Sequence, residues 1–157
     1  MKTKLALILL LLLAANTLLA QKKWHFGFQT GNLYLGDKTG DNATGLFIIY
    51  QIKEAYGMEL TATRNWFNVK RDNAFHMTHY ALHALFGTND LTGLYGFSFF
   101  QFNRKEINSH LTGFGVDFGL RTYLLSNKRF KLSLTTLSTY SNKLDRPTLF
   151  IGLGLIF

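Results

Sequence analysis

Hydrophobic and polar residues alternate one by one along most of the chain after residue 23. Met58 and Leu60, for example, alternate with Glu59 and Thr61. A period of two places successive side chains on opposite faces of a β-strand, so that one face meets an apolar environment and the other a small or polar one. The alternation predicts eight strands, at residues 22–35, 44–53, 56–67, 75–86, 93–103, 110–124, 129–140 and 147–157.

One segment breaks this alternation. Phe99 and Phe100 are adjacent large aromatic residues, and the apolar parity switches between them. A β-bulge at this point would restore the register, because a bulge inserts one extra residue into a strand. We therefore expect a bulge within the strand at 93–103.

The predicted connections alternate in length. Three are short, at 53–55, 87–91 and 125–128, and four are longer and richer in charge, at 36–43, 68–74, 103–109 and 141–146. Successive strands joined in this way form an antiparallel up-and-down sheet.

The first twenty residues differ from the rest of the chain. Lys2 and Lys4 precede an unbroken apolar run over residues 5–15, and Ala20 ends the segment before a polar stretch. This is the pattern of a secretory signal peptide, and the run is short of the about 20 apolar residues that a membrane-spanning helix needs. We expect residues 1–20 to be a cleaved signal peptide and residues 21–157 to be one exported domain. A retained anchor is the alternative.

Composition narrows the possible chemistry. The chain has no Cys, which excludes disulfides, thiolate metal sites, a Cys nucleophile and the lipid-modified Cys of a lipoprotein. Its net charge of +8 comes from scattered basic residues, so no nucleic-acid partner is expected. There is a single Pro in 157 residues. This scarcity fits a closed sheet in which backbone N–H groups are needed for pairing between strands.

Two architectures fit eight antiparallel strands in an exported chain: a soluble barrel with an apolar ligand cavity, and an outer-membrane barrel whose apolar face meets lipid. The face opposite the large aliphatic residues carries mainly Gly, Thr, Ser, Gln and His. An apolar cavity would instead be lined by large apolar side chains. We therefore predict an all-β fold, an eight-stranded antiparallel up-and-down transmembrane β-barrel with a polar lumen.

Charged residues on the polar parity are predicted to pair inside this lumen, because an unpaired desolvated charge is costly. An acid–base catalytic set is the alternative interpretation. Eight strands enclose little more than room for their own side chains, so wide-pore transport is not expected, and a narrow channel is a further alternative. The predicted lumen network comprises Glu59, Asp117, Arg121, Lys131, His79 and His83.

The spacing of His76, His79 and His83 would indicate a metal site if the segment were helical. On a strand, His76 points away from the other two, and positions 79 and 83 are about 13 Å apart, which is too far to share one ion. The surrounding alternation favours a strand. We expect these side chains to fill the lumen, and we predict no metal or other cofactor.

The carboxyl end carries a motif that points to a known family. Gly152, Leu155 and Phe157 match Gly-x-x-Φ-x-Φ, and the chain ends here as the terminal strand of bacterial outer-membrane barrels does. Ile151 departs from the polar residue that is usual before the Gly. Together with the alternation over residues 21–157, the motif resembles small eight-stranded barrels of the OmpA-transmembrane or OmpX type.

This resemblance implies a monomeric protein in the outer membrane of a Gram-negative envelope, with short periplasmic turns and longer outer loops. It also implies contact with outer-membrane lipid and lipopolysaccharide. In that family the terminal motif, here Gly152, Leu155 and Phe157, is read by the barrel-assembly machinery during biogenesis.

Some eight-stranded outer-membrane barrels are lipid A deacylases, so an enzymatic function has to be considered. Ser141 and Asn142 resemble the Ser-Asn of the deacylase motif His-x-Ser-Asn, but Thr139 occupies the position of the catalytic His. A Ser hydroxyl without an adjacent base is a weak nucleophile. We expect a non-enzymatic protein with a structural or surface-interaction role.

Basic residues occur in the longer connections, among acidic ones, and could contact lipopolysaccharide phosphates. A solvated rim is the simpler interpretation, since charge-balanced loops need no ligand. The residues concerned are Lys38, Lys70, Arg71, Arg104, Lys105, Lys143 and Arg146.

Overall fold

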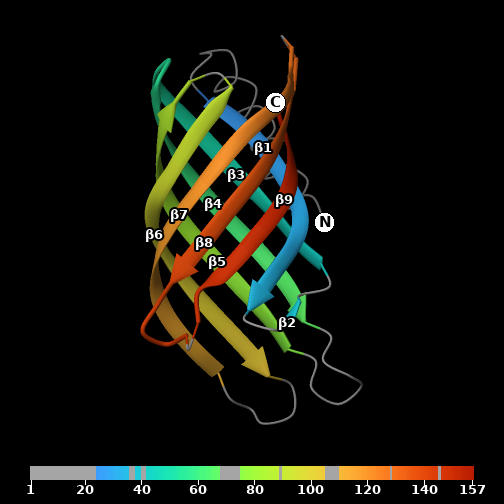
Figure 1. Ribbon diagram of the computed structural model, residues 1–157, viewed down its shortest axis with the longest axis vertical. Coiled ribbons are helices and arrows are strands. Elements are labelled where there is room, and N and C mark those ends of the chain that lie inside the picture. Colours follow the sequence, from blue (N-terminus) through green and yellow to red (C-terminus); the bar gives the residue numbers. More distant parts are fainter. Residues whose placement is uncertain are drawn as a thin grey trace, which may run out of the picture.

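The computed structural model describes residues 24–35, 38–39, 42–67, 75–88, 90–104, 110–127, 129–144 and 146–157. Regular structure within these residues consists of β-strands (Figure 1). The bounds are β1 Trp24–Leu35, β2 Lys38–Thr39, β3 Asn42–Lys53, β4 Tyr56–Phe67, β5 Phe75–Gly87, β6 Leu91–Arg104, β7 His110–Ser126, β8 Lys131–Tyr140 and β9 Thr148–Ile156. Over the same ranges, no helix is long and apolar enough to cross a membrane. The predicted signal peptide at 1–20 lies outside the described residues.

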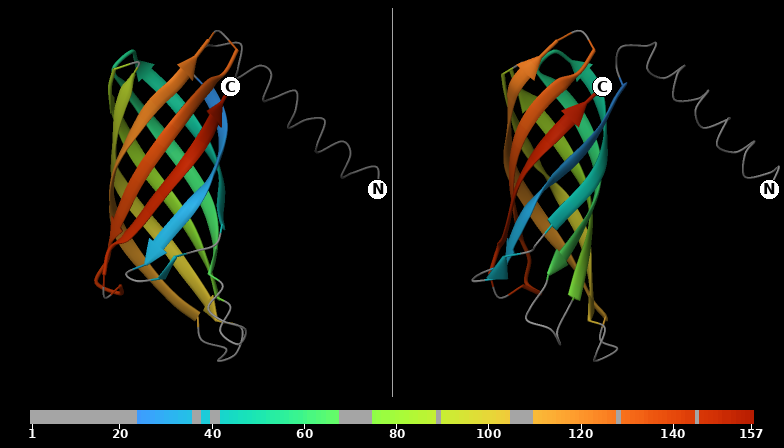
Figure 2. Two further views of the ribbon diagram at one scale, coloured as in Figure 1. Left: turned by 45° about the vertical axis from the view of Figure 1, so that its right-hand side comes forward. Right: turned by 90° about the vertical axis from the view of Figure 1, so that its right-hand side faces the viewer.

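The long strands form one closed antiparallel sheet. From β3 onward each pairs with its neighbour in the chain, β1 pairs with β3, and β1 also pairs with β9 from Gly27↔Ile156 to Leu35↔Thr148. This last ladder closes the barrel, as the views in Figure 2 show. β2 is a two-residue strand that pairs with the end of β1. The predicted eight-stranded antiparallel barrel is therefore confirmed.

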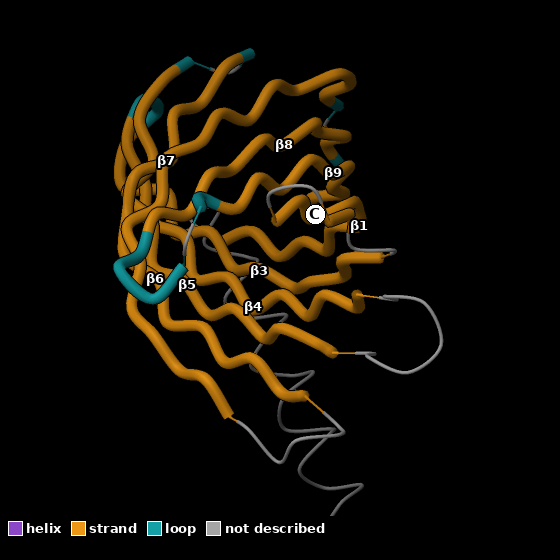
Figure 3. Tube along the Cα trace, turned by 60° about the horizontal axis from the view of Figure 1, so that its bottom comes forward, coloured by secondary structure: helices purple, strands orange, loops and turns teal. Residues whose placement is uncertain are grey.

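The two ends of the barrel differ in their connections, and loops occur only where strands end (Figure 3). One end carries the tight connections after β3, β5 and β7, and we call it the short-turn end. Phe157 lies there beside the start of β1, because its N–H donates to the Phe26 carbonyl oxygen at 2.8 Å. The other end, which carries the connections after β1, β4, β6 and β8, is the long-loop end.

The bulge predicted at Phe99 and Phe100 is wrong. β6 pairs without a register shift with both neighbours, from Phe75↔Arg104 on one side and Asn103↔His110 on the other. Phe100 simply points inward and is fully buried. It fits because the neighbouring strand has Gly113 beside it, where a Cβ would lie 2.5 Å from the Phe100 ring.

Register shifts occur elsewhere, at Gln51/Lys53 in β3 and at Tyr123/Leu125 in β7. Both lie next to the short-turn end. Each extra residue changes the face of the side chains that follow it, which explains why the apolar positions Leu124 and Leu125 are both exposed.

The outward face of the barrel is strongly apolar. Leu46, Phe97 and Phe114 are 69%, 66% and 77% exposed, and many other large hydrophobic residues on the same parity are exposed as well. Aromatic rings meet across β6 and β7, where Tyr95 and Phe118 have ring centroids 5.0 Å apart. The chain thus exposes many large apolar side chains on the outward parity and buries the opposite parity.

Candidate functional site

Five charged or ionisable side chains meet in the middle of the lumen. Glu59 extends from β4, His79 and His83 from β5, and Asp117 and Arg121 from β7, each on the inward parity of its strand. All five are buried, with at most 5% of any residue exposed. We call these five residues the central cluster.

The first pair of the cluster joins two strands that are not neighbours in the sheet. Arg121 of β7 donates from Nη1 to Glu59 Oε2, and from Nη2 to Glu59 Oε1 at 3.2 Å. The pair therefore spans the lumen in a bidentate arrangement, which is the strong geometry for a guanidinium and a carboxylate.

Neighbouring side chains provide further contacts to this pair. Arg121 Nε donates to Thr135 Oγ1 at 3.0 Å, and Thr61 Oγ1 donates to Glu59 Oε1 at 2.8 Å. The Arg121 guanidinium carbon also lies 4.6 Å from the centroid of the Phe47 ring. Burying two charges is tolerable only with such additional partners.

The second half of the cluster is built around Asp117. Its Oδ1 accepts a hydrogen bond from Ser98 Oγ at 2.8 Å, and its Oδ2 lies 3.0 Å from His83 Nε2 and 3.4 Å from His79 Nε2. His83 Nδ1 lies 3.5 Å from Glu59 Oε1. His83 thus stands between the two carboxylates and joins both halves into one group.

His79 and His83 share a partner, although their spacing on a strand predicted that they lie too far apart to share one ion. Their strand positions are four residues apart, yet both Nε2 atoms approach the same oxygen of Asp117. Side chains several ångströms long can lean toward one another across the spacing of the backbone. The described residues nevertheless contain no group of three or more His, Asp or Glu side chains arranged to hold a metal ion.

Lys131 was predicted to join the central cluster and does not. It is half-buried at the start of β8, and its Nζ lies 5.2 Å from the centroid of the Tyr123 ring. It lines a small pocket at the short-turn end together with His25, Gln51 and Glu54. Parity placed Lys131 correctly on the inner side, but its depth along the barrel separates it from Asp117 and Glu59.

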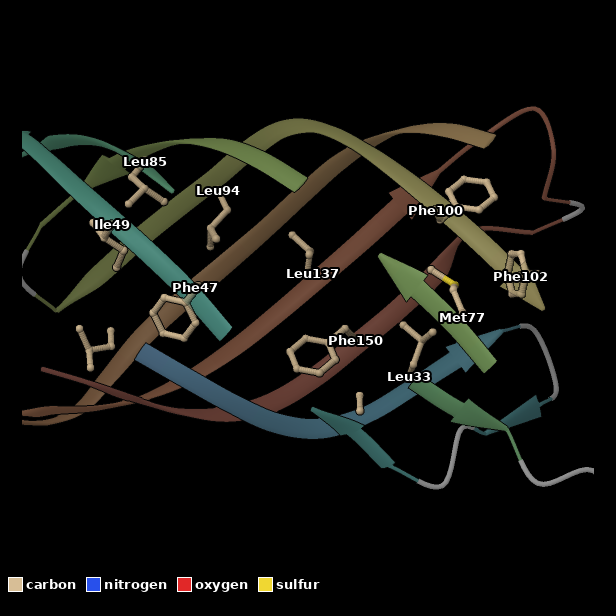
Figure 4. Packing of buried hydrophobic residues seen from close by; sticks show 12 residues of the cluster. Leu33, Phe47, Ile49, Met77, Leu85, Leu94, Phe100, Phe102, Leu137 and Phe150 are labelled. Carbon is tan, nitrogen blue, oxygen red and sulfur yellow. The ribbon is translucent and has the colours of Figure 1, made fainter. Parts of the chain in front are cut away.

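The lumen is not polar throughout, in contrast to the expectation. Buried apolar side chains lie toward both ends of the lumen (Figure 4). We call Ile49, Leu85, Leu94 and Ile156 the short-turn layer, and Leu33, Met77, Phe100, Phe102 and Phe150 the long-loop layer; the same apolar cluster also contains Phe47 and Leu137. The central cluster and its polar neighbours therefore form a polar belt between two apolar layers, and further polar residues such as Thr92 and Lys131 lie near the short-turn end.

The residues of the deacylase-like sequence point to different places. Ser141 Oγ donates to the Phe114 carbonyl oxygen at 2.6 Å and accepts a hydrogen bond from the Lys143 N–H at 3.2 Å, so it stabilises the turn. Thr139 is buried in the lumen, where its Oγ1 lies 3.4 Å from His79 Nε2. The same ring nitrogen faces Asp117. A catalytic relay would need both nitrogens of the imidazole, one for the hydroxyl and one for the carboxylate.

The terminal motif lies on β9 beside β1. Gly152 is buried, Leu155 is half-buried, and Phe157 is exposed at the short-turn end. Of the basic residues considered for lipopolysaccharide contact, Lys143 and Arg146 are exposed after β8. Lys70, Arg71 and Lys105 lie outside the described residues, and the side chains of Lys38 and Arg104 are not described.

Several residues of the site were not identified from the sequence, namely Thr61, Ser98, Thr135 and Phe47. Each stands on the inward parity next to a charged residue of its own strand or of the neighbouring strand. That parity was a usable signal, but many small polar residues share it.

No family model and no curated protein matches this sequence. Solved structures do match its fold. Neisserial surface protein A aligns with a TM-score of 0.64 at 12% identity, over 85% of this chain and 96% of that chain. This chain has the fold of the small eight-stranded outer-membrane barrels. Ail of Yersinia pestis, solved with the heparin analogue sucrose octasulfate, aligns with a TM-score of 0.52 at 17% identity, over 85% and 96% of the two chains.

A third similar structure is the N-terminal β-barrel domain of Pseudomonas aeruginosa OprF, with a TM-score of 0.51 at 18% identity over 85% of this chain and 96% of that chain. These identities are low, so the shared property is the barrel itself. The similar structures come from proteins named for a surface location, for attachment and invasion, and as outer-membrane proteins.

Proposed function

We propose that this protein is an integral outer-membrane β-barrel of a Gram-negative envelope, exported by its amino-terminal segment, with a non-enzymatic structural or surface-interaction role. The observation that carries the proposal is that the apolar side chains face outward and the charged side chains face inward, the reverse of a soluble protein. The outward face exposes large apolar residues such as Leu46 and Phe97, while Glu59, Asp117 and Arg121 are buried inside.

An apolar outer face of this extent is not stable in water. Soluble monomers rarely expose continuous apolar patches larger than a few hundred Å², whereas a transmembrane barrel presents an apolar band to lipid. Its interior would also be unsuited to carrying an apolar ligand, because the middle of the lumen holds the central cluster. The solved structures with the same fold support the outer-membrane location.

The side chains that fill the lumen favour a closed barrel over a channel. Water and ions would have to pass the short-turn layer, the Glu59–Arg121 pair that spans the lumen and the long-loop layer. We therefore propose that any activity resides on the exposed surface.

The proposed partners follow from the location. Outer-membrane lipid would cover the apolar band, and lipopolysaccharide phosphates could meet the exposed Lys143 and Arg146 at the long-loop end. The barrel-assembly machinery would read Gly152, Leu155 and Phe157 during biogenesis. No catalytic residue is proposed, since Ser141 and Thr139 have the structural contacts described above.

Membrane fractionation tests the proposal. The chain is expressed in a Gram-negative host, membranes are washed with carbonate, and boiled and unboiled samples are compared by gel mobility. We expect the protein to stay with the outer membrane and to change mobility on heating, because a closed barrel resists unfolding in detergent. A soluble product with a heat-independent mobility would refute it.

Conductance tests the closed lumen separately. Purified protein in planar bilayers should show no discrete conductance steps, and the Arg121→Ala variant should stay silent because both apolar layers remain. Discrete steps in the unaltered protein would instead support a narrow channel.

A further inference from the structure

A small cavity lies between the central cluster and the long-loop layer. Its volume is about 20 Å³, and every residue that lines it is buried. Apolar members of the long-loop layer form one part of its wall. The polar part consists of Gln29, Thr63, Asn65, His79, Thr139 and Thr148.

Two oxygens in this wall have no hydrogen-bond partner among the described residues, namely Gln29 Oε1 and Asn65 Oδ1. Gln29 is 4% exposed and Asn65 is 1% exposed, so bulk water does not reach them. Buried side-chain oxygens in folded proteins are nearly always hydrogen-bonded. Both oxygens therefore require a donor at this place.

The side chains alone do not supply that donor. Gln29 Nε2 already donates to Thr63 Oγ1 at 3.2 Å. Rotating the Gln29 amide would bring its oxygen to Thr63 but would leave the NH₂ group without this acceptor. In the rotated orientation the NH₂ group would need an acceptor of its own in the wall.

The volume of the cavity and the charge of its lining residues limit which molecule can be the donor. About 10–15 Å³ of such space holds one water molecule, which needs two to four polar partners. No carboxylate lines the cavity in the part of the chain that the structure describes, so a metal cation would meet only neutral oxygens. We propose that one resident water molecule occupies this site and donates its two hydrogen bonds to Gln29 Oε1 and Asn65 Oδ1.

The water would extend the polar belt around the lumen. On one side stand Gln29 of β1 and Asn65 of β4, and on the other stand His79 of β5 and Thr139 of β8, which contact each other at 3.4 Å. His79 in turn contacts Asp117. The site thus connects the central cluster to β1, the strand that closes the barrel.

Solution NMR of the whole chain in detergent micelles tests this site. We expect the side-chain NH₂ protons of Gln29 to show a rotating-frame Overhauser effect to the water resonance, with the sign of a bound water and not of chemical exchange. In Asn65→Leu, which removes one acceptor and fills the cavity, this cross-peak should be lost. In the control Asn32→Leu, which changes an exposed amide on β1, it should remain.

Crystals of the unaltered chain grown in rubidium salts provide a test that does not depend on a variant folding. The expected result is a water-sized density peak within hydrogen-bond distance of Gln29 Oε1 and Asn65 Oδ1, without anomalous signal. An anomalous peak would show that a monovalent cation occupies the site and not water. A cavity without density would overturn the proposal. Persistence of the NMR cross-peak in Asn65→Leu would also contradict the proposal.

Discussion

The middle of the lumen and its two ends follow different chemistry on the same inward parity. In the middle, Glu59 and Arg121 form a charged pair across the barrel. Toward the ends, Leu94 and Phe100 are buried among other apolar side chains. Leu94 and Phe100 even lie on one strand, β6, with Ser98, a partner of Asp117, between them.

Alternation therefore determines the side of the sheet that a residue faces but not the polarity at each depth of the lumen. A charged group is stable in the lumen only where an opposite charge from another strand reaches it. Toward the ends, apolar side chains such as Leu94 and Phe100 fill much of the space instead. The same apolar layers separate the central cluster from water at both ends.

The largest expected effect comes from leaving one charge of the central cluster without its partner. Arg121→Met keeps an unbranched side chain but leaves the Glu59 carboxylate buried and unpaired, and we expect it to lower the free energy of unfolding by about 3–5 kcal/mol. Urea unfolding in lipid vesicles, followed by gel mobility, measures this loss.

Two further variants serve as comparisons for Arg121→Met. Arg129→Met, at an exposed position after β7, should change the free energy by no more than about 0.5 kcal/mol. The double variant Glu59→Gln with Arg121→Met should cost less than Arg121→Met alone, because no buried charge is left unpaired. Equal losses for Arg121→Met and Arg129→Met would show that the cluster contributes nothing.

A smaller loss is expected at the other carboxylate. Asp117→Asn keeps the shape of the side chain but weakens the hydrogen bonds to His83 and Ser98, and we expect a cost of about 1.5–3 kcal/mol. The same urea titration measures it, and the His79 and His83 ring signals should shift in an NMR spectrum. Unshifted signals would contradict the contacts at Asp117.

The inner and outer faces are expected to differ in the cost of adding a methyl group at a glycine. A Cβ at Gly96, which faces the lumen, would clash with the Leu82 carbonyl oxygen and lie 2.8 Å from His83 Cα, both backbone atoms. Gly96→Ala should therefore cost about 1–3 kcal/mol of unfolding free energy. At Gly93, on the outward face, a Cβ would meet mainly the movable Phe86 ring at 3.0 Å, so Gly93→Ala should cost less. The reverse order would show that the lumen is wider than described.

The smallest effect compares two adjacent isoleucines. Ile49 belongs to the short-turn layer, whereas Ile48 is on the outward parity of the same strand. Ile49→Val should lower the free energy of unfolding by about 0.5–1.5 kcal/mol, because the lost methylene leaves a void among packed neighbours. Ile48→Val should have a smaller effect, because lipid tails can fill the space. Equal effects would remove the distinction between the packed layer and the outer face.

Much of the fold could be predicted from local pattern. The alternation around Met58 and Glu59 located β4, and the segments identified in this way correspond to the eight long strands. β2 escaped prediction because two residues cannot show a period. The bulge at Phe99 and Phe100 was a wrong prediction, because the switch of aromatic parity was taken to need an extra residue, whereas Phe100 is simply buried on the inward face beside Gly113.

The candidate site was less accessible to sequence reasoning. Inward parity grouped Glu59, Asp117, Arg121 and Lys131 as equals, yet only the first three meet. Which charges pair depends on the depth that each residue reaches when the strands are tilted and staggered around the barrel, and this is set jointly by all the ladders.

The sequence alone therefore determined which side of each strand faces outward, because a period of two shows within a few residues, and its connections predicted an antiparallel sheet. Tertiary structure alone decided that Arg121 reaches Glu59, that Lys131 lies apart over Tyr123, and that apolar layers close off the polar belt. The physical reason is that these contacts depend on how the strands are tilted and staggered around the closed barrel: Arg121 and Glu59 lie on β7 and β4, which are not neighbours in the sheet.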